Sequence, residues 1–253
     1  MSRRPVVAAA VLAVVLAGCG THHTAKASSS TTVKGTVTVL AAASLTGTLT
    51  RLGKDFEAAH HGVRVRFSFG ASSTLAQQVA AGAPADVFAA ASPATMKRAT
   101  GARDPVVFAR NQLVIAVPPG NPQGIHRLAD LARPGVKLAL CAEQVPCGAA
   151  ARTALAAAHV TVHPATLEQD VKATLTKLTL GEVDAALVYR TDAKAAGNKV
   201  TAVEFPESRS AINDYPIAVL GDAPNPAGAR AFVAYVRSAR GRDALSEAGF
   251  QPP

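Results

Sequence analysis

Strand-like and helix-like segments alternate along most of this chain, and this alternation limits the folds open to it. Residues 37–40 (VTVL) have the apolar, β-branched character of a short strand. Between Leu45 and Phe56, apolar residues recur at i, i+4, i+7 and i+11, which is one face of an amphipathic helix. Residues 63–69 (VRVRFSF) then alternate apolar and polar side chains, as in a strand with one face in water. The ordered part of the chain therefore begins as strand, helix and strand.

The same alternation continues to the C-terminus. Further strands are expected at residues 86–91, 110–117, 136–140, 184–189, 200–205 and 215–220. Further helices are expected at residues 74–81, 126–132, 170–180 and 225–246, and after Pro146. Repeated alternation of this kind favours an α/β fold with parallel sheets and helices on both faces.

The length of the chain permits two such lobes, since 253 residues make two units of ordinary size. We expect residues 36–110 and 216–253 to form one lobe and residues 111–215 to form the other. The chain would cross between them near residues 110–113 and again near residues 213–217. A ligand is then expected in the cleft between the lobes, at the carboxyl ends of strands.

The N-terminus has the pattern of an export signal. An apolar run of 13 residues, Pro5 to Ala17, follows two arginines and is too short to span a membrane. It ends in LAGC, which resembles the bacterial lipoprotein box, so residues 1–18 are expected to be a signal peptide and Cys19 the lipid-bearing N-terminus. An ordinary secretory signal with an unrelated cysteine is the alternative. Residues 19–35 are mostly small and polar and indicate a flexible tether.

The positive charge of the chain does not indicate a nucleic-acid partner. Removing residues 1–18 takes away two arginines, so the formal charge falls from +9 to +7. The remaining Lys and Arg residues are scattered, with no basic run and no interleaved aromatics. We expect a basic surface in water that favours anions.

Two cysteines remain after Cys19, namely Cys141 and Cys147 in the segment CAEQVPC. In an exported protein this pair could form a disulfide that closes a small loop. No Cys-x-x-Cys or Cys/His spacing indicates a zinc site.

Four expected helix N-termini share the chemistry of an anion site. They are Ser44, the segment of residues 70–74 (GASST), the Pro146-Cys147-Gly148 segment and Asp170-Val171, and at each of them backbone N–H groups lack partners. Such N–H groups and the partial positive charge at a helix N-terminus attract anions. Ser44 is expected both to cap its helix and to bind the ligand.

These segments lack positively charged residues. No Lys or Arg occurs between residues 40 and 50, between 67 and 83, or between 138 and 151. A loop that binds a nucleotide would normally end in Gly-Lys-Ser/Thr, and none does. Neutral donors alone suit a small, fully deprotonated oxyanion that is enclosed on all sides.

The order of these segments resembles the molybdate-binding proteins of bacterial ABC importers. The resemblance covers nearly all of residues 36–250 and rests on AAASLT, SSTLAQQVAAGAPADVF, VPCGAAARTAL, EQDVKATLTKLTLGEVDAALVYRTDA and FPESRSAINDYPIAVL. It implies a two-lobed, periplasmic-binding-protein-like fold that closes over molybdate or tungstate and delivers the oxyanion to a permease.

The resemblance also implies which residues hold the ligand. They are Ser44, Ser72, Cys147, Val171 and Tyr189. The serines would offer hydroxyl and backbone donors, Cys147 and Val171 backbone N–H groups, and Tyr189 its phenol. No cofactor and no direct cation ligand is implied. The implied partners are an ABC permease with its ATPase subunit, and the protein is expected to be a monomer anchored to the outer face of the cell membrane.

One departure from the family pattern concerns the helix that follows Pro146. Relatives commonly carry Pro-Ala-Gly where this chain has Pro146-Cys147-Gly148. The backbone N–H survives that change, but a disulfide between Cys141 and Cys147 would reshape the loop and could alter selectivity.

An enzyme is the alternative of another class, with Ser44 as the nucleophile of a hydrolase. The chain has no Gly-x-Ser-x-Gly elbow and no evident histidine base for Ser44. His159 and His163 have the i, i+4 spacing of metal ligands, but the intervening residues 160–162 (VTV) favour a strand.

Other oxyanions are alternatives within the same class. Monohydrogen phosphate carries a proton and needs a carboxylate acceptor, and we expect Asp86, Glu143 and Asp170 to serve as capping or supporting groups instead. Sulfate has the charge and shape of molybdate and is only smaller, so the size of the cavity decides between them. A surface lipoprotein that binds no oxyanion is a third reading.

Overall fold

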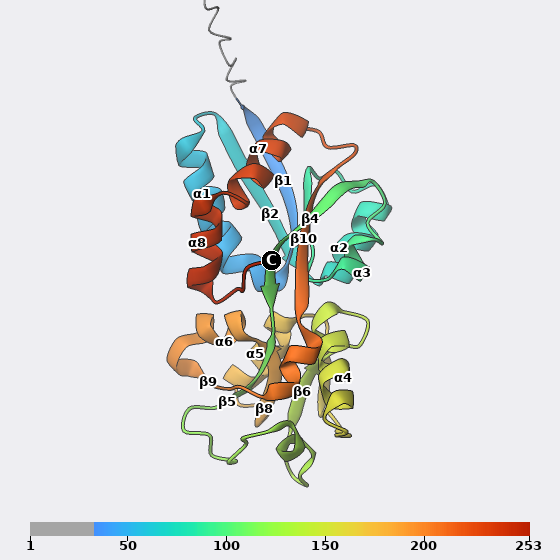
Figure 1. Cartoon of the computed structure of the whole chain (residues 1–253), viewed down its shortest axis with the longest axis vertical. Helices are drawn as coiled ribbons and strands as arrows, with labels where there is room; N and C mark the ends of the chain where they lie inside the picture. Colours follow the sequence, from blue (N-terminus) through green and yellow to red (C-terminus); the bar gives the residue numbers. More distant parts are fainter. Residues whose placement is uncertain (1–32) are drawn as a thin grey trace, which may run out of the picture. The chain divides into compact units, whose positions relative to one another are not determined.

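Two five-stranded sheets organise residues 33–253, the part of the chain that the computed structural model describes (Figure 1). The first sheet has the order β2-β1-β3-β10-β4 and the second the order β7-β6-β8-β5-β9. We call the parts built on them lobe I and lobe II. The strands of lobe I are β1 (Gly35–Ala42), β2 (Val63–Gly70), β3 (Val87–Ala89), β4 (Ala102–Asn111) and β10 (Asn213–Leu220). Those of lobe II are β5 (Leu113–Val117), β6 (Leu138–Cys141), β7 (Thr166–Glu168), β8 (Ala185–Tyr189) and β9 (Thr201–Val203).

Both sheets are mixed, so the expectation of parallel sheets is only partly right. In lobe I, β1 pairs in parallel with β2 and β3, but β10 runs antiparallel to β3 and β4. In lobe II, β6 pairs in parallel with β7 and β8, whereas β5 runs antiparallel to β8 and β9. The reason lies in the connections: β4 carries the chain out of lobe I and β10 carries it back, so the two strands run in opposite directions.

Helices cover the sheets of both lobes. Lobe I contains α1 (Thr46–Ala59), α2 (Ser72–Ala80), α3 (Pro93–Met96), α7 (Pro226–Val236) and α8 (Ala239–Ala248), and lobe II contains α4 (Pro146–Ala157), α5 (Val171–Thr179) and α6 (Arg190–Ala196). Short 3₁₀ helices are η1 (Ala43–Leu45), η2 (Leu128–Ala132), η3 (Gly197–Lys199) and η4 (Pro206–Ala211). In lobe I, α1, α7 and α8 pack together, and α2 packs with α3 (Figure 1).

The core of lobe I follows the apolar stripe that the sequence shows. Leu49, Leu52 and Phe56 of α1 are fully buried. Phe56 packs edge-on against Phe232 of α7, with ring centroids 5.4 Å apart. Such aromatic contacts add to the free energy gained from burial, and they hold α1 and α7 against the same face of the sheet.

The expected single C-terminal helix at residues 225–246 is wrong, because the chain forms two helices there. α7 ends at Val236 and α8 begins at Ala239. Ser238 interrupts the helix, since its hydroxyl accepts a hydrogen bond from the Gly241 N–H at 3.3 Å and so caps α8.

Two chain connections join the lobes. β4 ends at Asn111 and β5 of the other sheet begins at Leu113, while β10 begins at Asn213 after η4. Gln251 near the C-terminus pairs with Arg110 through two backbone hydrogen bonds of 2.8 Å. Its side-chain amide also donates to the Gln112 side chain at 2.7 Å. Gln251 thus contacts the residues on either side of Asn111.

Some expectations concern residues outside the described part of the chain. The signal peptide (residues 1–18), the lipidated Cys19 and the tether up to residue 32 are among them. Between residues 33 and 253, no helix has the length and apolar character needed to cross a bilayer.

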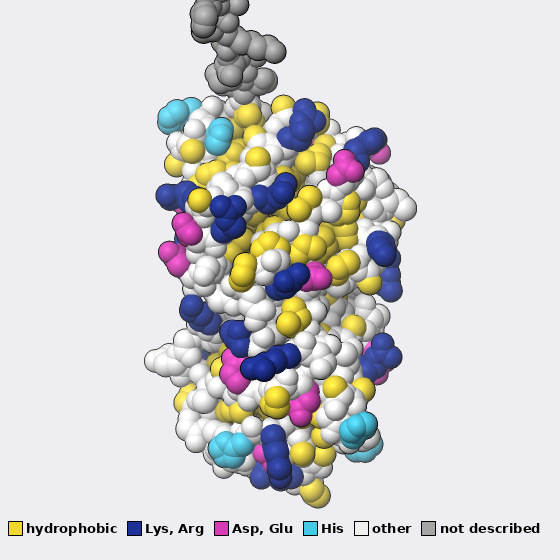
Figure 2. All heavy atoms as spheres, viewed as in Figure 1, with side chains coloured by type: hydrophobic (Ala, Val, Ile, Leu, Met, Phe, Trp, Pro, Cys, Tyr) yellow, Lys and Arg dark blue, Asp and Glu magenta, His cyan; other side chains and the backbone are white. Residues whose placement is uncertain are grey.

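The face of the molecule shown in Figure 2 carries charges of both signs. On the face shown in Figure 2, Lys and Arg side chains are spread over both lobes and are interspersed with Asp and Glu. This distribution does not resemble the continuous basic stripe of a nucleic-acid site.

Candidate functional site

A small cavity lies between the two lobes, at the carboxyl ends of β1, β2, β3 and β8. Its volume is about 20 Å³. The residues that line it are Ala42, Ala43, Ser44, Gly70, Ala71, Ser72 and Ala91 of lobe I, and Val145, Pro146, Cys147, Asp170, Val171 and Tyr189 of lobe II. All five residues that the family resemblance singles out are therefore found around one cavity.

Ser44 reaches the cavity from η1, directly after β1. Its hydroxyl oxygen lies 2.8 Å from the hydroxyl oxygen of Tyr215, and both side chains are buried. The expectation that Ser44 caps its helix is wrong. Ala42 occupies the N-cap position of η1, and α1 begins at Thr46 without a side-chain cap. Because the chain turns through η1 before α1 starts, the Ser44 hydroxyl points across the lobe to Tyr215 instead.

Ser72 is the first residue of α2, and its hydroxyl accepts a hydrogen bond from the Ala91 N–H at 3.0 Å. The expected start of this helix at Thr74 is thus two residues late. Because the Ser72 oxygen already accepts from Ala91, its own hydrogen remains free to donate into the cavity. The N–H groups of the first turn of α2 lack partners within the helix as well.

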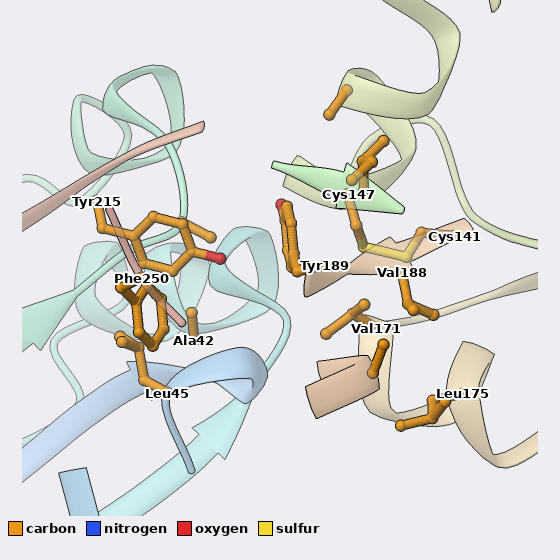
Figure 3. Packing of buried hydrophobic residues seen from close by; sticks show 14 of the residues in the cluster. Ala42, Leu45, Cys141, Cys147, Val171, Leu175, Val188, Tyr189, Tyr215 and Phe250 are labelled. Carbon is orange, nitrogen blue, oxygen red and sulfur yellow. A yellow bond between two sulfur atoms is a disulfide. The ribbon is translucent and has the colours of Figure 1, made fainter. Parts of the chain in front are cut away.

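Cys147 stands in the first turn of α4, after Pro146 at the first helical position. A disulfide joins it to Cys141 at the end of β6, with the Cα atoms 5.8 Å apart (Figure 3). The loop between the two cysteines is therefore closed at its base. The helix has no side-chain cap, so the Cys147 and Gly148 N–H groups are left for a ligand.

Asp170 precedes α5 and caps it. Its Oδ1 accepts hydrogen bonds from the N–H groups of Lys172 at 2.8 Å and Ala173 at 2.9 Å. Val171, one residue earlier, lines the cavity, and its N–H is not among the groups that donate to Asp170. The Asp170 carboxylate has thus accepted two donors, in agreement with the expectation that it is a capping group. Asp86 is likewise used within lobe I, where it accepts from the Thr38 N–H at 2.7 Å.

Tyr189 ends β8, and only 1% of it is exposed. Within residues 33–253 its hydroxyl has no hydrogen-bond partner. Burial raises the pKa of Tyr189 well above its usual value, and the nearby Tyr215 and Asp192 raise it further. The phenol therefore stays protonated and remains a donor. A buried donor without a partner is costly in free energy, which points to a ligand that accepts from it.

Tyr215 and Asp192 belong to the surroundings of the site. Both stand in segments that carry the family resemblance, but neither is among the residues that it implies as ligands. Tyr215 lies in β10, fully buried, with its ring edge-on to that of Tyr189 at 6.0 Å between centroids (Figure 3). Asp192 in α6 forms an ion pair with Lys172, its Oδ1 2.9 Å from the Lys172 Nζ. Burial raises the pKa of Asp192, although Lys172 opposes that rise.

The cavity is equipped to bind an anion through neutral donors. Among the described residues that line it there is no Lys, Arg or His, and Asp170 has its own partners. Hydroxyl groups and helix N-termini converge on it, an arrangement that binds oxyanions.

A larger hollow of about 550 Å³ opens beside the cavity and shares Ser44 with it. Arg51 and Glu247, which pair at 2.8 Å, lie along it together with Lys172 and Lys194. It is far wider than a tetrahedral anion and is lined by charged side chains of both signs, so the small cavity with its neutral donors is the candidate binding site.

No metal centre is found in the described part of the chain. Residues 33–253 contain no cluster of three or more His, Cys, Asp or Glu side chains that could hold a metal ion. The strand expected at residues 160–162 is absent: β7 begins only at Thr166. His159 instead ends the turn after α4 with a left-handed φ of 52°.

Comparisons with known proteins agree with this architecture. A family described as "Bacterial extracellular solute-binding protein" matches residues 37–251. The molybdate-binding protein ModA of Mycobacterium tuberculosis is 42% identical over 249 residues, which cover 96% of this chain and 95% of that protein.

Solved structures show the same fold. A periplasmic molybdate-binding protein from Azotobacter vinelandii matches with a TM-score of 0.75 and 20% identity, over 86% of this chain and 99% of that one. The sulfate-binding protein SubI of Mycobacterium tuberculosis matches equally well, with a TM-score of 0.75, 21% identity and 86% of both chains covered. The two-lobed α/β fold with two crossover segments is thus confirmed. Because proteins for two different oxyanions match equally well, the fold by itself does not identify the solute.

Proposed function

The chain belongs to the family of bacterial extracellular solute-binding proteins, and we propose that its solute is molybdate or tungstate. The oxyanion would occupy the cavity between the lobes and would be passed to an ABC permease and its ATPase subunit. The protein would act as a monomer, without a cofactor. The identity of 42% to a molybdate-binding protein over nearly the whole chain supports this solute.

The unpartnered Tyr189 hydroxyl is the observation that carries the proposal. It lies in a cavity that is also lined by the hydroxyls of Ser44 and Ser72 and by the first turns of α4 and α5. Each of these groups donates hydrogen bonds, and a fully deprotonated oxyanion only accepts them. Hydrogen bonds to a charged partner contribute roughly 1.5–3 kcal/mol each, so several of them suffice for tight binding.

Membership of this family implies that the protein is exported. We further propose that it is held at the membrane by lipid on Cys19, which follows from the LAGC sequence. Replacing Cys19 by serine should move the protein from the membrane fraction to the soluble fraction. Unchanged membrane association of the Cys19→Ser variant would contradict a lipid anchor at this residue.

The test of the solute is a thermal-shift and calorimetric titration of the purified protein with molybdate, tungstate, sulfate and phosphate. A ligand at 100 times its dissociation constant adds about 2.7 kcal/mol to the free energy of unfolding. We expect this stabilisation from molybdate and tungstate. Ser44→Ala should reduce it, because that variant loses a donor to the oxyanion.

Sulfate is the second candidate, and the same titration distinguishes it. A larger stabilisation by sulfate than by molybdate would agree with the proposed site but would identify sulfate as the solute. Monohydrogen phosphate needs a carboxylate acceptor for its proton, and we expect Asp170, whose Oδ1 already accepts two N–H groups, to serve as a cap instead. The phosphate arm of the titration tests this expectation.

The hydrolase alternative has less support. The hydroxyl oxygen of Ser44 contacts Tyr215 and not a basic side chain, and the family is one of binding proteins. Hydrolysis of a phosphate ester that is lost in Ser44→Ala would revive this alternative.

A further inference from the structure

We propose that Tyr215 is a positioning residue of the oxyanion site, which donates its hydroxyl hydrogen to Ser44 and thereby directs the Ser44 hydrogen at the ligand. The inference rests on the proposed function, since it requires an oxyanion in the cavity. Tyr215 itself does not line the cavity, so it would act through Ser44.

The contact between the two side chains is direct and largely buried. The hydroxyl oxygens of Ser44 and Tyr215 lie 2.8 Å apart. Tyr215 is fully buried and Ser44 is 7% exposed. In the absence of a ligand either hydroxyl could donate to the other. The chemistry of the ligand decides which one does.

An oxyanion such as molybdate offers only acceptor atoms. A hydroxyl that touches it must therefore donate its one hydrogen to the anion. Once Ser44 has done so, its 2.8 Å contact with Tyr215 is a hydrogen bond only if Tyr215 donates. Burial also raises the pKa of the Tyr215 phenol, which keeps that hydrogen in place.

Ser72 provides an independent instance of the same arrangement. Its oxygen accepts from the Ala91 N–H at 3.0 Å, and a backbone N–H can only donate. The Ser72 hydrogen is therefore left for a ligand in the cavity, which Ser72 lines. Under this proposal both Ser44 and Ser72, the serines that line the cavity, accept a hydrogen bond from a buried donor, Ser72 from the backbone and Ser44 from Tyr215.

The Tyr215 hydroxyl would affect the strength of the hydrogen bond that Ser44 donates. Hydrogen bonds in a chain polarise one another, so a serine that accepts one becomes a better donor of the next. Tyr215 would also rest against Tyr189, whose ring meets it edge-on. The ring contact survives in Tyr215→Phe, whereas the donated hydrogen bond does not, and this difference makes the role testable.

The experiment is a double-mutant cycle on the dissociation constant for sodium molybdate, measured by calorimetry on the purified protein. The variants are Tyr215→Phe, Ser44→Ala and the combination of both. We expect Tyr215→Phe to weaken binding by about 3- to 10-fold, the value of one hydrogen bond. In the Ser44→Ala background, Tyr215→Phe should weaken binding by less than about 2-fold, because the Ser44 hydroxyl that accepts from Tyr215 is already absent. Tyr235→Phe is the matched control, since Tyr235 is partly exposed and packs on Phe56, and it should bind like the wild type.

A Tyr215→Phe loss of equal size in both backgrounds would overturn the inference and assign Tyr215 a packing role only. If the Tyr215→Phe variant does not fold by itself, the dissociation constants of Ser44→Ala and of the double variant are compared instead. The double variant lacks both hydroxyls of the pair, so it leaves neither one buried without its partner. A further loss of more than about 3-fold in that comparison would overturn the inference. If the wild type binds no oxyanion, both the proposed function and this inference are overturned. If the effects of the two substitutions on binding are additive, only this inference is overturned.

Discussion

The Tyr189 hydroxyl is buried without a partner within the described residues, so removing it should have opposite effects on stability and on binding. Tyr189→Phe removes a donor to the oxyanion and should weaken molybdate binding by about 1–3 kcal/mol. It also removes an unsatisfied polar group, so the free energy of unfolding of the ligand-free protein should be unchanged or higher. Calorimetry and urea denaturation measure the two quantities.

Tyr235→Phe serves as the control for this prediction, because it removes the same atom from a residue that does not line the cavity. A Tyr189→Phe variant that loses stability while keeping its affinity for molybdate would show that the hydroxyl serves the fold and not the ligand.

Asp192 is the residue whose charge should make stability depend on pH. Burial raises its pKa despite the nearby Lys172. The stability gained from the protonated carboxyl is present below the unfolded pKa of about 4 and is lost as the pH rises through the raised folded pKa. Asp192→Asn cannot ionise at this position, so it should not lose stability in this way. The difference in free energy of unfolding, variant minus wild type, should therefore increase between pH 4 and pH 7.

Urea denaturation at several pH values tests this prediction. Lys172→Gln provides a second variant with the opposite sign, since loss of the cation should raise the Asp192 pKa further and lower stability near pH 7. A constant difference between Asp192→Asn and the wild type across this range would mean that burial does not perturb the carboxyl.

At the scale of elements, the start of α4 depends on a glycine. A Cβ at Gly148 would lie 2.0 Å from the carbonyl oxygen of Ala142, which is backbone and cannot swing aside. Gly148→Ala should therefore push α4 away from the loop that follows β6 and move the Cys147 N–H. We expect a loss of about 1–3 kcal/mol in the free energy of unfolding, as for overpacking in a core, and weaker molybdate binding, measured by denaturation and calorimetry.

Gly47→Ala is the matched control, because Gly47 also lies in the first turn of a helix but has open space where its Cβ would be. Its replacement should stabilise α1 by roughly 0.5–1 kcal/mol. Equal effects of the two substitutions would mean that helix propensity and not the close approach at Ala142 governs α4.

Elements with strong local signals are those that the sequence predicts well. The apolar stripe between Leu45 and Phe56 predicts α1, which is observed at Thr46–Ala59, and Asp170 caps α5 at the predicted boundary. β4 was not predicted over most of its length. It is the edge strand of its sheet, so Pro105 is tolerated there, and its first residues are largely exposed and lack a clear period.

The residues of the site, too, are predicted only where a local sequence pattern marks them. Serines at helix starts suggest donors to an anion, and the family resemblance suggests the set that includes Tyr189. Tyr215 gives no such sign, because its hydrogen bond to Ser44 joins residues 171 positions apart. In the sequence it is one more apolar residue of a buried strand, and only the packing of β10 beside η1 reveals its hydroxyl as a partner of the site.

At the scale of the whole molecule, the proposed site requires the two lobes to move apart and together. Lobe I supplies Ser44 and Ser72 to the cavity, and lobe II supplies Cys147, Val171 and Tyr189. The volume of about 20 Å³ is little more than the roughly 10–15 Å³ that one water requires. A tetrahedral oxyanion is larger, so the lobes must move apart to admit it, bending at the connections near Asn111 and Asn213.

An anion bound as proposed would accept hydrogen bonds from both lobes and so favour the closed state, because a ligand shifts a population toward the form that it binds more tightly. We expect the radius of gyration in solution to be smaller with saturating molybdate than without it. Small-angle X-ray scattering at constant ionic strength measures this difference. Tyr189→Phe should reach the same decrease at a higher molybdate concentration, in proportion to its loss of affinity, which separates closure from a general effect of the salt. An unchanged radius of gyration at a concentration that calorimetry shows to be saturating would mean that the ligand enters without closing the lobes.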